Sequence, residues 1–180
     1  MKNLLFILLS FVLLSASKLQ AKPLTLKEVT EASCRVTSID EFSYARGSGT
    51  VVNEDDKKYY ILTNAHVVDQ SNGVWVEFFK DAKKSFFIPA KIELIRYQNN
   101  TSIDLAIISV KKTLLGKQSP RVIPLASKEF KINEGDYIFG AGYPSGNWAM
   151  CWEGRINDVM RNTVTFNALP SPGQSGTGVL

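Results

Sequence analysis

The chain has 180 residues, of which 44% are hydrophobic and 21% charged, and its formal net charge at pH 7 is +4. This length suffices for one domain or for two small barrels packed together. Basic residues cluster no further than adjacent pairs such as Lys57-Lys58, so we expect no nucleic-acid partner. Two cysteines and one histidine cannot build an ordinary structural zinc site, and the sequence implies no metal and no cofactor.

Residues 1–21 are predicted to be a secretory signal peptide. Lys2 is followed by the run Leu4–Leu14, which is apolar except for Ser10, and then by small residues. This run has about eleven residues, fewer than the ~18 that a spanning helix needs. We therefore expect cleavage rather than an uncleaved anchor, with no stable membrane insertion afterwards. Cleavage would remove two lysines and no acid, leaving a formal charge of +2. The expected location is exported, either periplasmic or extracellular.

The next segment is predicted to begin with a short helix and to continue as strands. Leu26, Val29 and Thr30 have helical spacing within Leu24–Ala32. From Ser33 onward, short β-forming runs alternate with turn residues. We predict six strands, at 34–39, 49–52, 59–63, 74–79, 90–95 and 105–110. Six strands with little helix between them predict a closed antiparallel barrel in a first unit of residues 22–115.

A second unit is predicted over residues 116–180. The polar segment Lys111–Arg121, with Gly116 and Pro120, reads as the link between the two units. After it the β-type pattern restarts, at 122–125, 136–142, 151–159 and 163–166. Cys34 and Cys151 fall in different units, so we expect two free and mostly buried thiols.

The only histidine, His66, lies in the segment Thr63-Asn64-Ala65-His66-Val67-Val68, just after a predicted strand. Imidazole is the side chain that can both accept and return a proton near neutral pH. A lone histidine is often structural, but the strand-and-turn setting favours a general base.

Asp104 opens the predicted strand that follows, in Ile103-Asp104-Leu105-Ala106-Ile107-Ile108. Its proposed role is to accept a hydrogen bond from the far nitrogen of the imidazole, which fixes the tautomer of the ring. An acid that simply caps a turn is the plain alternative. Asp40 and Asp69 are rival acids, although Asp69 is only three residues past His66 and poorly placed to orient that ring.

Ser175 lies in Pro172-Gly173-Gln174-Ser175-Gly176-Thr177-Gly178. A flexible glycine-rich turn is the plain interpretation. As a nucleophile, Ser175 needs glycine on both sides, because the chain must turn sharply there. The amides of Gly173 and Ser175 would then point at one spot and form an oxyanion hole. An esterase elbow is excluded, since that motif needs glycine where Thr177 stands and has the opposite residue order.

The order His66, Asp104, Ser175, with these three neighbourhoods, resembles the chymotrypsin-type serine peptidases. The segments 63–68 and 172–176 resemble most the trypsin-like peptidases of the bacterial HtrA kind. The resemblance implies an all-β fold of two antiparallel barrels whose catalytic groups meet at the seam. It also implies a secreted or periplasmic serine endopeptidase that cleaves polypeptide substrates through an acyl-enzyme.

Two further assignments depend on the resemblance. Leu169, six residues before Ser175, would form the floor of the primary substrate pocket, and an apolar floor disfavours a Lys or Arg side chain. The glycine-rich segment 140–146 resembles the strand and loop that precede the active-site loop. We interpret it as scaffold, because Ser145 has no second histidine to activate it.

The sequence departs from the family after Ser175, because only five residues follow it. The family adds two further strands there, so we expect an incomplete second barrel with an open edge. The activity of this 180-residue form and its oligomeric state stay open. A non-catalytic or truncated remnant that acts as a peptide-binding module is the alternative function, and a compact viral or phage-borne protease is a weaker one.

Overall fold

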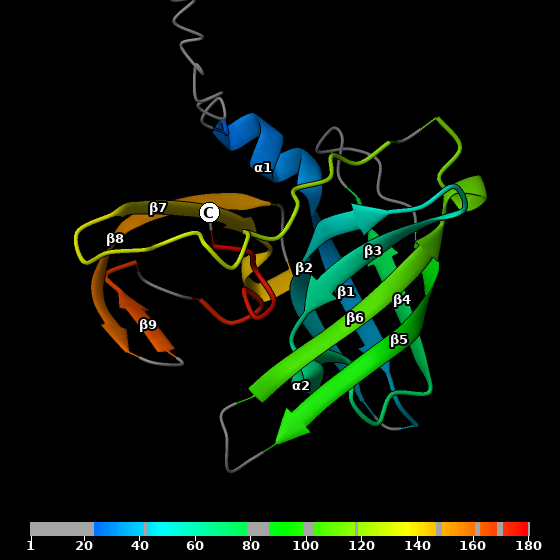
Figure 1. Cartoon of the computed structure of the whole chain (residues 1–180). Coiled ribbons are helices and arrows are strands. Elements are labelled where there is room, and N and C mark those ends of the chain that lie inside the picture. The colour runs from blue at the N-terminus through cyan, green and yellow to red at the C-terminus, as the bar shows by residue number, and fades with distance from the viewer. Residues whose placement is uncertain are drawn as a thin grey trace, which may run out of the picture.

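The computed structural model describes residues 24–41, 43–78, 87–98, 103–117, 119–146, 149–160, 163–168 and 171–179. The predicted signal peptide, residues 1–21, and the predicted pocket residue Leu169 lie outside this set. A strand barrel and a smaller sheet stand side by side, and the C-terminal segment returns between them (Figure 1). No helix within the described ranges is long and apolar enough to cross a membrane.

The first unit is a closed barrel of six antiparallel strands, as the sequence predicted. The strand order around the barrel is β1-β2-β3-β6-β5-β4. Two strands carry bulges, between Val51 and Asn53 on β2 and between Ile92 and Leu94 on β5, and such bulges help a sheet to curl into a barrel. The strands are β1 Ser33–Ile39, β2 Tyr44–Glu54, β3 Lys58–Thr63, β4 Gly73–Glu77, β5 Ile88–Gln98 and β6 Ile103–Lys111.

Alternating burial builds the core of the barrel. On β3, Tyr59, Ile61 and Thr63 are buried while the residues between them are partly exposed, as expected for a strand with one face inward. Small and β-branched side chains fill the interior, because a six-stranded barrel leaves little room inside it. The fully buried members are Cys34, Val36, Val51, Ile61, Val68, Val76, Ala106 and Ile108.

The second unit is a three-stranded antiparallel sheet in the described part of the chain, where the resemblance implies a barrel. Its order is β7-β8-β9. The predicted strand at 122–125 is wrong, because these residues form no strand. Ile123 donates a single backbone hydrogen bond to Val51 O (2.9 Å), and Pro124 follows with no N–H to extend the pairing. The bounds are β7 Tyr137–Gly142, β8 Met150–Met160 and β9 Thr163–Phe166, with short 3₁₀ turns η1 Lys112–Leu114 and η2 Pro144–Gly146.

The predicted N-terminal helix is present as α1, Leu26–Ala32. Thr25 and Glu28 form a reciprocal capping box at its start, which satisfies two backbone donors that a helix end leaves free. Val29 and Ala32 are buried against Ala141 of β7 and Ile123. The helix therefore packs on the small sheet and on the segment that links the two units.

Both cysteines are free thiols, as predicted, but only Cys34 is buried. Burial in the barrel core raises the pKa of the Cys34 thiol. The expectation that Cys151 is also buried is wrong. It lies on β8, where Ile156 is the one buried residue, and its sulfur is 3.3 Å from the Thr30 hydroxyl.

Candidate active site

His66 stands on a single helical turn that leaves its side chain in the open. Strand β3 ends at Thr63, Asn64 is the N-cap, and α2 spans Ala65–Val68. The other three residues of this turn are buried, whereas 47% of the His66 side chain is exposed. The Ser38 hydroxyl of β1 donates to Val67 O (2.5 Å) and holds the turn against the barrel. The sequence predicted this strand-then-turn setting.

Asp104 lies beside His66 because of the strand register. Thr63 of β3 pairs with Ala106 of β6 in antiparallel fashion, so the residues after Thr63 run back past Asp104. Oδ2 of Asp104 is 2.5 Å from Nδ1 of His66, and Oδ1 accepts from the His66 amide at 2.9 Å. Two contacts from one carboxylate fix both the ring and the backbone of this turn.

The electrostatics of the pair follow from these bonds. Partial burial acts to raise the pKa of Asp104, but hydrogen bonds from the His66 ring and from the amides of His66 and Ala65 hold the pKa below its ordinary value. Asp104 is thus an ionised acceptor at neutral pH. Because a carboxylate can only accept, the Nδ1 contact places the proton of neutral His66 on Nδ1 and leaves Nε2 with a free lone pair.

The rival acids take other places in the structure. Asp40 accepts from the amide of Ser43 at 2.7 Å and from its hydroxyl at 2.8 Å, within the β1–β2 turn. Asp69 is the C-cap of α2 and is exposed. Of the three candidate acids, Asp104 is the one that contacts the imidazole.

Ser175 lies on a turn that we call the Ser175 loop, residues 171–179, between the barrel and the small sheet (Figure 1). Strand β2 holds the middle of this loop. The amide of Ser48 donates to Ser175 O (2.7 Å), and the Ser48 hydroxyl donates to Gly173 O (2.8 Å). Both glycines of the turn, Gly173 at φ 88° and Gly176 at φ 86°, adopt the left-handed region that glycine tolerates best.

The ends of the Ser175 loop are also held. The amide of Gly178 donates to the hydroxyl of Thr50 on β2 (2.9 Å). At the other end, the amide of Ser145 in η2 donates to Pro172 O (2.5 Å). The glycine-rich segment 140–146, predicted to be scaffold, thus contacts the loop directly, and a Cβ at position 140 would lie only 2.7 Å from Gly178 O.

The structure places Ser175 next to the turn that bears His66. A Cβ added at Gly47 would lie 2.7 Å from Cγ2 of Val67 and 3.0 Å from Ser175 O, so the Ser175 backbone lies beside the residue that follows His66. Ser175 is partly exposed. Among the described residues, the His66 ring is hydrogen-bonded to Asp104 and not to Ser175.

The amides of Gly173 and Ser175, predicted to form the oxyanion hole, have no hydrogen-bond acceptor among the described residues. Both residues are only partly buried. Two backbone donors without partners, two positions apart and beside a serine hydroxyl, can stabilise a negatively charged oxygen. The third predicted element of substrate binding, Leu169, lies outside the described residues.

Two polar residues at this site were not predicted from the sequence. The Asn64 side chain donates from Nδ2 to the backbone oxygen of Asp104 (2.7 Å) and ties the His66 turn to β6. Ser48 is fully buried and bonds the Ser175 loop. A possible signal for Ser48 is its place between Gly47 and Gly49, since a strand with two glycines permits a close approach of another backbone.

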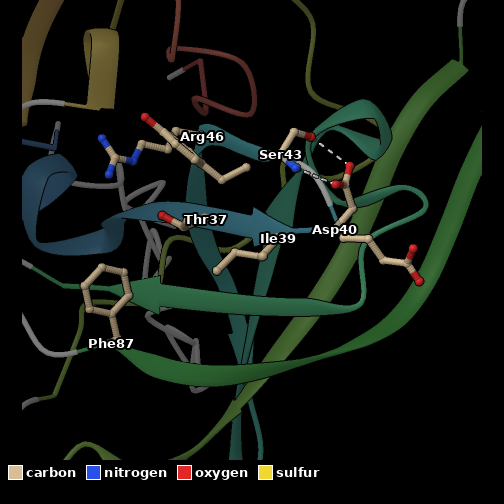
Figure 2. Close-up of a pocket in the computed structure, with 8 residues that line it drawn as sticks. Thr37, Ile39, Asp40, Ser43, Arg46 and Phe87 are labelled. Atoms are coloured by element: carbon tan, nitrogen blue, oxygen red, sulfur yellow. Dashed lines mark hydrogen bonds between the residues drawn. The ribbon is translucent and has the colours of Figure 1, made fainter.

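A hollow of about 440 Å³ lies on the outer face of β1 and β2, shown in Figure 2. Arg46 lies at its edge, two positions before Ser48 on β2. The buried hydroxyl of Thr37 in its wall has no partner among the described residues. The hollow contains none of the predicted catalytic residues; its lining is Thr37, Ile39, Asp40, Glu41, Ser43, Tyr44, Arg46 and Phe87.

A family model described as a trypsin-like peptidase domain matches residues 47–180, well over half of the chain and all three predicted catalytic positions. The chain belongs to the trypsin-like peptidase family.

Two curated relatives, both described as probable periplasmic serine endoprotease DegP-like, come from Buchnera aphidicola. The one from subspecies Baizongia pistaciae is 29% identical over 119 residues, which is 66% of this chain and 22% of the relative. The one from subspecies Schizaphis graminum is 26% identical over 142 residues, 79% of this chain and 24% of the relative.

Solved structures of peptidases share the fold of this family member. A serine endoprotease from Yersinia pestis superposes with a TM-score of 0.68 at 22% identity, covering 88% of this chain and 54% of that one. The active form of the Rv3671c protease from M. tuberculosis gives a TM-score of 0.62 at 21% identity, covering 86% and 66%. The chain thus spans less than a quarter of the two curated relatives and about half of the Yersinia structure.

Proposed function

We propose that this trypsin-like peptidase is an exported serine endopeptidase in which His66 is the general base, Asp104 orients it, and Ser175 is the nucleophile. One observation carries the proposal: the His66 ring is bonded to Asp104 through Nδ1 at 2.5 Å, with the Ser175 loop beside the same turn. This arrangement leaves Nε2 as the free nitrogen of the ring, the atom that a general base needs to take up a serine proton.

The reaction would proceed by acyl transfer. The Ser175 hydroxyl attacks the carbonyl carbon of the scissile peptide as its proton passes to Nε2 of His66. The resulting oxyanion accepts hydrogen bonds from the amides of Gly173 and Ser175. The C–N bond then breaks, and His66 gives its proton to the leaving amine. A water molecule deprotonated by His66 hydrolyses the acyl-enzyme, and the proton returns to Ser175. Asp104 stays ionised throughout and stabilises the imidazolium.

The substrate would be an extended polypeptide. Leu169 would form the floor of the pocket for the side chain before the scissile bond, and a medium apolar residue would fit there better than Lys or Arg, because nothing in an apolar floor pairs a charge.

Export depends on residues 1–21 acting as a cleaved signal peptide. The apolar run Leu4–Leu14 after Lys2 supports this, as does the description of both curated relatives as periplasmic.

The test is covalent labelling with a fluorophosphonate probe. The oxygen of an activated serine displaces fluoride from phosphorus, and the phosphonyl group stays bonded to the serine. We expect the 180-residue chain to be labelled at Ser175 and Ser175→Ala to lose both labelling and hydrolysis of a peptide substrate. Ser145→Ala is the matched control, since Ser145 is an exposed serine in a turn of the neighbouring glycine-rich segment. Labelling that persists in Ser175→Ala would contradict the proposal, because another serine would then be the nucleophile. A wild-type chain that is folded but never labelled would also contradict it and would favour a non-catalytic peptide-binding module.

A further inference from the structure

We propose that Ser48 is the positioning residue of the oxyanion hole, and that its amide and hydroxyl together fix the peptide unit that carries the Ser175 N–H. The inference rests on the proposed function. It assigns a role in that reaction to a residue of the barrel, far from Ser175 in the sequence.

Ser48 makes a connected set of hydrogen bonds to two other segments. Its amide donates to Ser175 O at 2.7 Å and its hydroxyl to Gly173 O at 2.8 Å. The same hydroxyl accepts from the amide of Tyr143 at 2.9 Å, just after β7. One side chain thus joins β2, the end of β7 and the Ser175 loop.

These bonds bracket one peptide unit. The Gly173 carbonyl belongs to the peptide unit before the one that contains the Ser175 N–H, and the Ser175 carbonyl belongs to the unit after it. Ser48 anchors both carbonyls. With both neighbouring carbonyls anchored, the Gln174–Ser175 unit can turn only by a flip about the axis that joins its two Cα atoms. Its own carbonyl accepts from the Thr177 amide (3.0 Å) and opposes that flip, so the direction of the Ser175 N–H is set before substrate arrives. Donors fixed in advance are what makes an oxyanion hole effective.

The strand pairing explains why Ser48 is free to do this. Strand β2 pairs with β3 only from Thr50 onward. At Ser48, which comes before this pairing begins, β3 therefore supplies no backbone acceptor for the amide. The Ser175 carbonyl takes the place that the next residue of a neighbouring strand would occupy. The carbonyl of Ser48 accepts instead from the Thr63 hydroxyl (2.7 Å), at the end of β3 that leads to His66.

The two flanking glycines make the close approach possible. A Cβ at Gly47 would meet Val67 and Ser175 O, and a Cβ at Gly49 would lie 2.6 Å from Cγ2 of Ile61. On the loop side, a Cβ at Gly176 would overlap Ser48 O and lie 2.5 Å from the Thr63 hydroxyl. Ser48 itself has no exposed surface, so water does not compete for its bonds, and hydrogen bonds in such an environment are electrostatically stronger.

The test compares Ser48→Ala with Ser109→Ala. Ser48→Ala removes the hydroxyl and keeps the hydrogen bond from the backbone amide of residue 48 to Ser175 O. Ser109→Ala is the matched control, because Ser109 is a buried serine of the same barrel whose hydroxyl bonds Glu93 and not the loop. We expect kcat for a peptide substrate to fall on the order of tenfold to a hundredfold in Ser48→Ala with little change in KM, since a misplaced donor weakens the transition state more than the ground state. A peptide aldehyde, which forms an oxyanion on Ser175, should lose affinity by a similar factor.

A second measurement does not depend on activity. Amide hydrogen exchange in peptides covering residues 173–178 should become faster in Ser48→Ala and stay as in wild type in Ser109→Ala, while exchange in β5 and β6 is unchanged by Ser48→Ala. Ser48→Cys keeps the size of the side chain with a weaker donor, and it should give an intermediate kcat and intermediate exchange.

The outcomes separate this inference from the proposed function. A wild-type chain without turnover or labelling refutes the proposed function, and exchange in the Ser175 loop then still reports whether Ser48 holds it. Loop exchange that does not change in folded Ser48→Ala or Ser48→Cys overturns the inference. It is also overturned if an active wild type and Ser48→Ala share the same kcat, or if Ser109→Ala lowers kcat as much.

Discussion

At the scale of single residues, His66 depends on one carboxylate for its orientation. Asp104 accepts from both the ring and the amide of His66. In Asp104→Asn, the amide side chain can still accept the backbone N–H, but its NH₂ group then faces Nδ1. The ring must turn or change tautomer, and Nε2 loses the lone pair that takes up the serine proton. We expect kcat to fall on the order of 10⁴-fold with the fold retained.

Steady-state hydrolysis of a peptide substrate, with circular dichroism as a check on folding, measures this effect. Asp69→Asn is the matched control, since Asp69 is three residues from His66 but makes no contact with its ring among the described residues. It should stay close to wild type. Equal losses in the two variants would remove Asp104 from its orienting role.

The sequence indicated His66, Asp104 and Ser175 as candidates because each lies inside a short motif, and the structure brings the His66 ring into contact with Asp104. It was not sufficient for Ser48. That residue is one polar side chain in a β-run, and its partners, Gly173 and Ser175, are more than a hundred residues further along the chain. Local pattern carries information about periodicity and turns, whereas this contact exists only once the barrel has closed and the Ser175 loop has returned to it.

At the scale of the elements, a carboxylate on β5 ties three neighbouring strands of the barrel. Glu93 accepts from Lys58 of β3 at 2.7 Å and from Ser109 of β6 at 2.8 Å, with Lys91 of its own strand at 3.2 Å. These bonds, led by that from Lys58, lower the pKa of Glu93 from 4.5 to about 2. The Glu93 carboxylate therefore becomes protonated at a higher pH in the unfolded chain than in the folded chain.

The sign of the resulting pH dependence follows from linkage. The contribution of Glu93 to stability is fully present above its ordinary pKa of 4.5 and is lost as pH falls towards about 2. In Glu93→Gln, we expect the free energy of unfolding to decrease less steeply over this interval than in wild type. Urea unfolding at a series of pH values measures the slopes. Glu41→Gln, at an exposed position of the β1–β2 turn, is the control and should keep the wild-type slope. If the slope of Glu93→Gln also equals the wild-type slope, the prediction is contradicted.

Element by element, prediction succeeded where the hydrophobic pattern was strong. The six barrel strands and α1 were found because alternating or helical spacing marks the buried face. The run at 122–125 has a β-like composition, yet it forms one backbone bond to β2 and then meets Pro124. Cys151 was expected inside because cysteine is commonly buried, but β8 is mostly exposed in this structure. Composition alone does not say which face of a strand another layer covers.

At the scale of the whole molecule, Tyr143 joins the two units, and it is the largest fully buried side chain among the described residues. It follows β7, and its phenol donates to Ser33 O of β1 at 3.1 Å. Burial raises the pKa of this phenol, so it remains a neutral donor. Its amide bonds Ser48, which links the docking of the small sheet to the geometry of the Ser175 loop.

Loss of this side chain should therefore weaken the sheet more than the barrel. The barrel closes on its own core, whereas the three described strands of the sheet bury few residues, Ile138, Ala141 and Ile156 among them. We expect Tyr143→Ala to lower the free energy of unfolding by about 3–5 kcal/mol, as for a large buried aromatic residue. Amide exchange should become faster in β7 and β8 by a larger factor than in β3 and β6. Tyr137→Ala, which removes an exposed tyrosine from β7, should cost less than about 1 kcal/mol. If exchange rises equally in all strands of Tyr143→Ala, the barrel and the sheet form one cooperative unit and the barrel's stability also depends on the docked sheet.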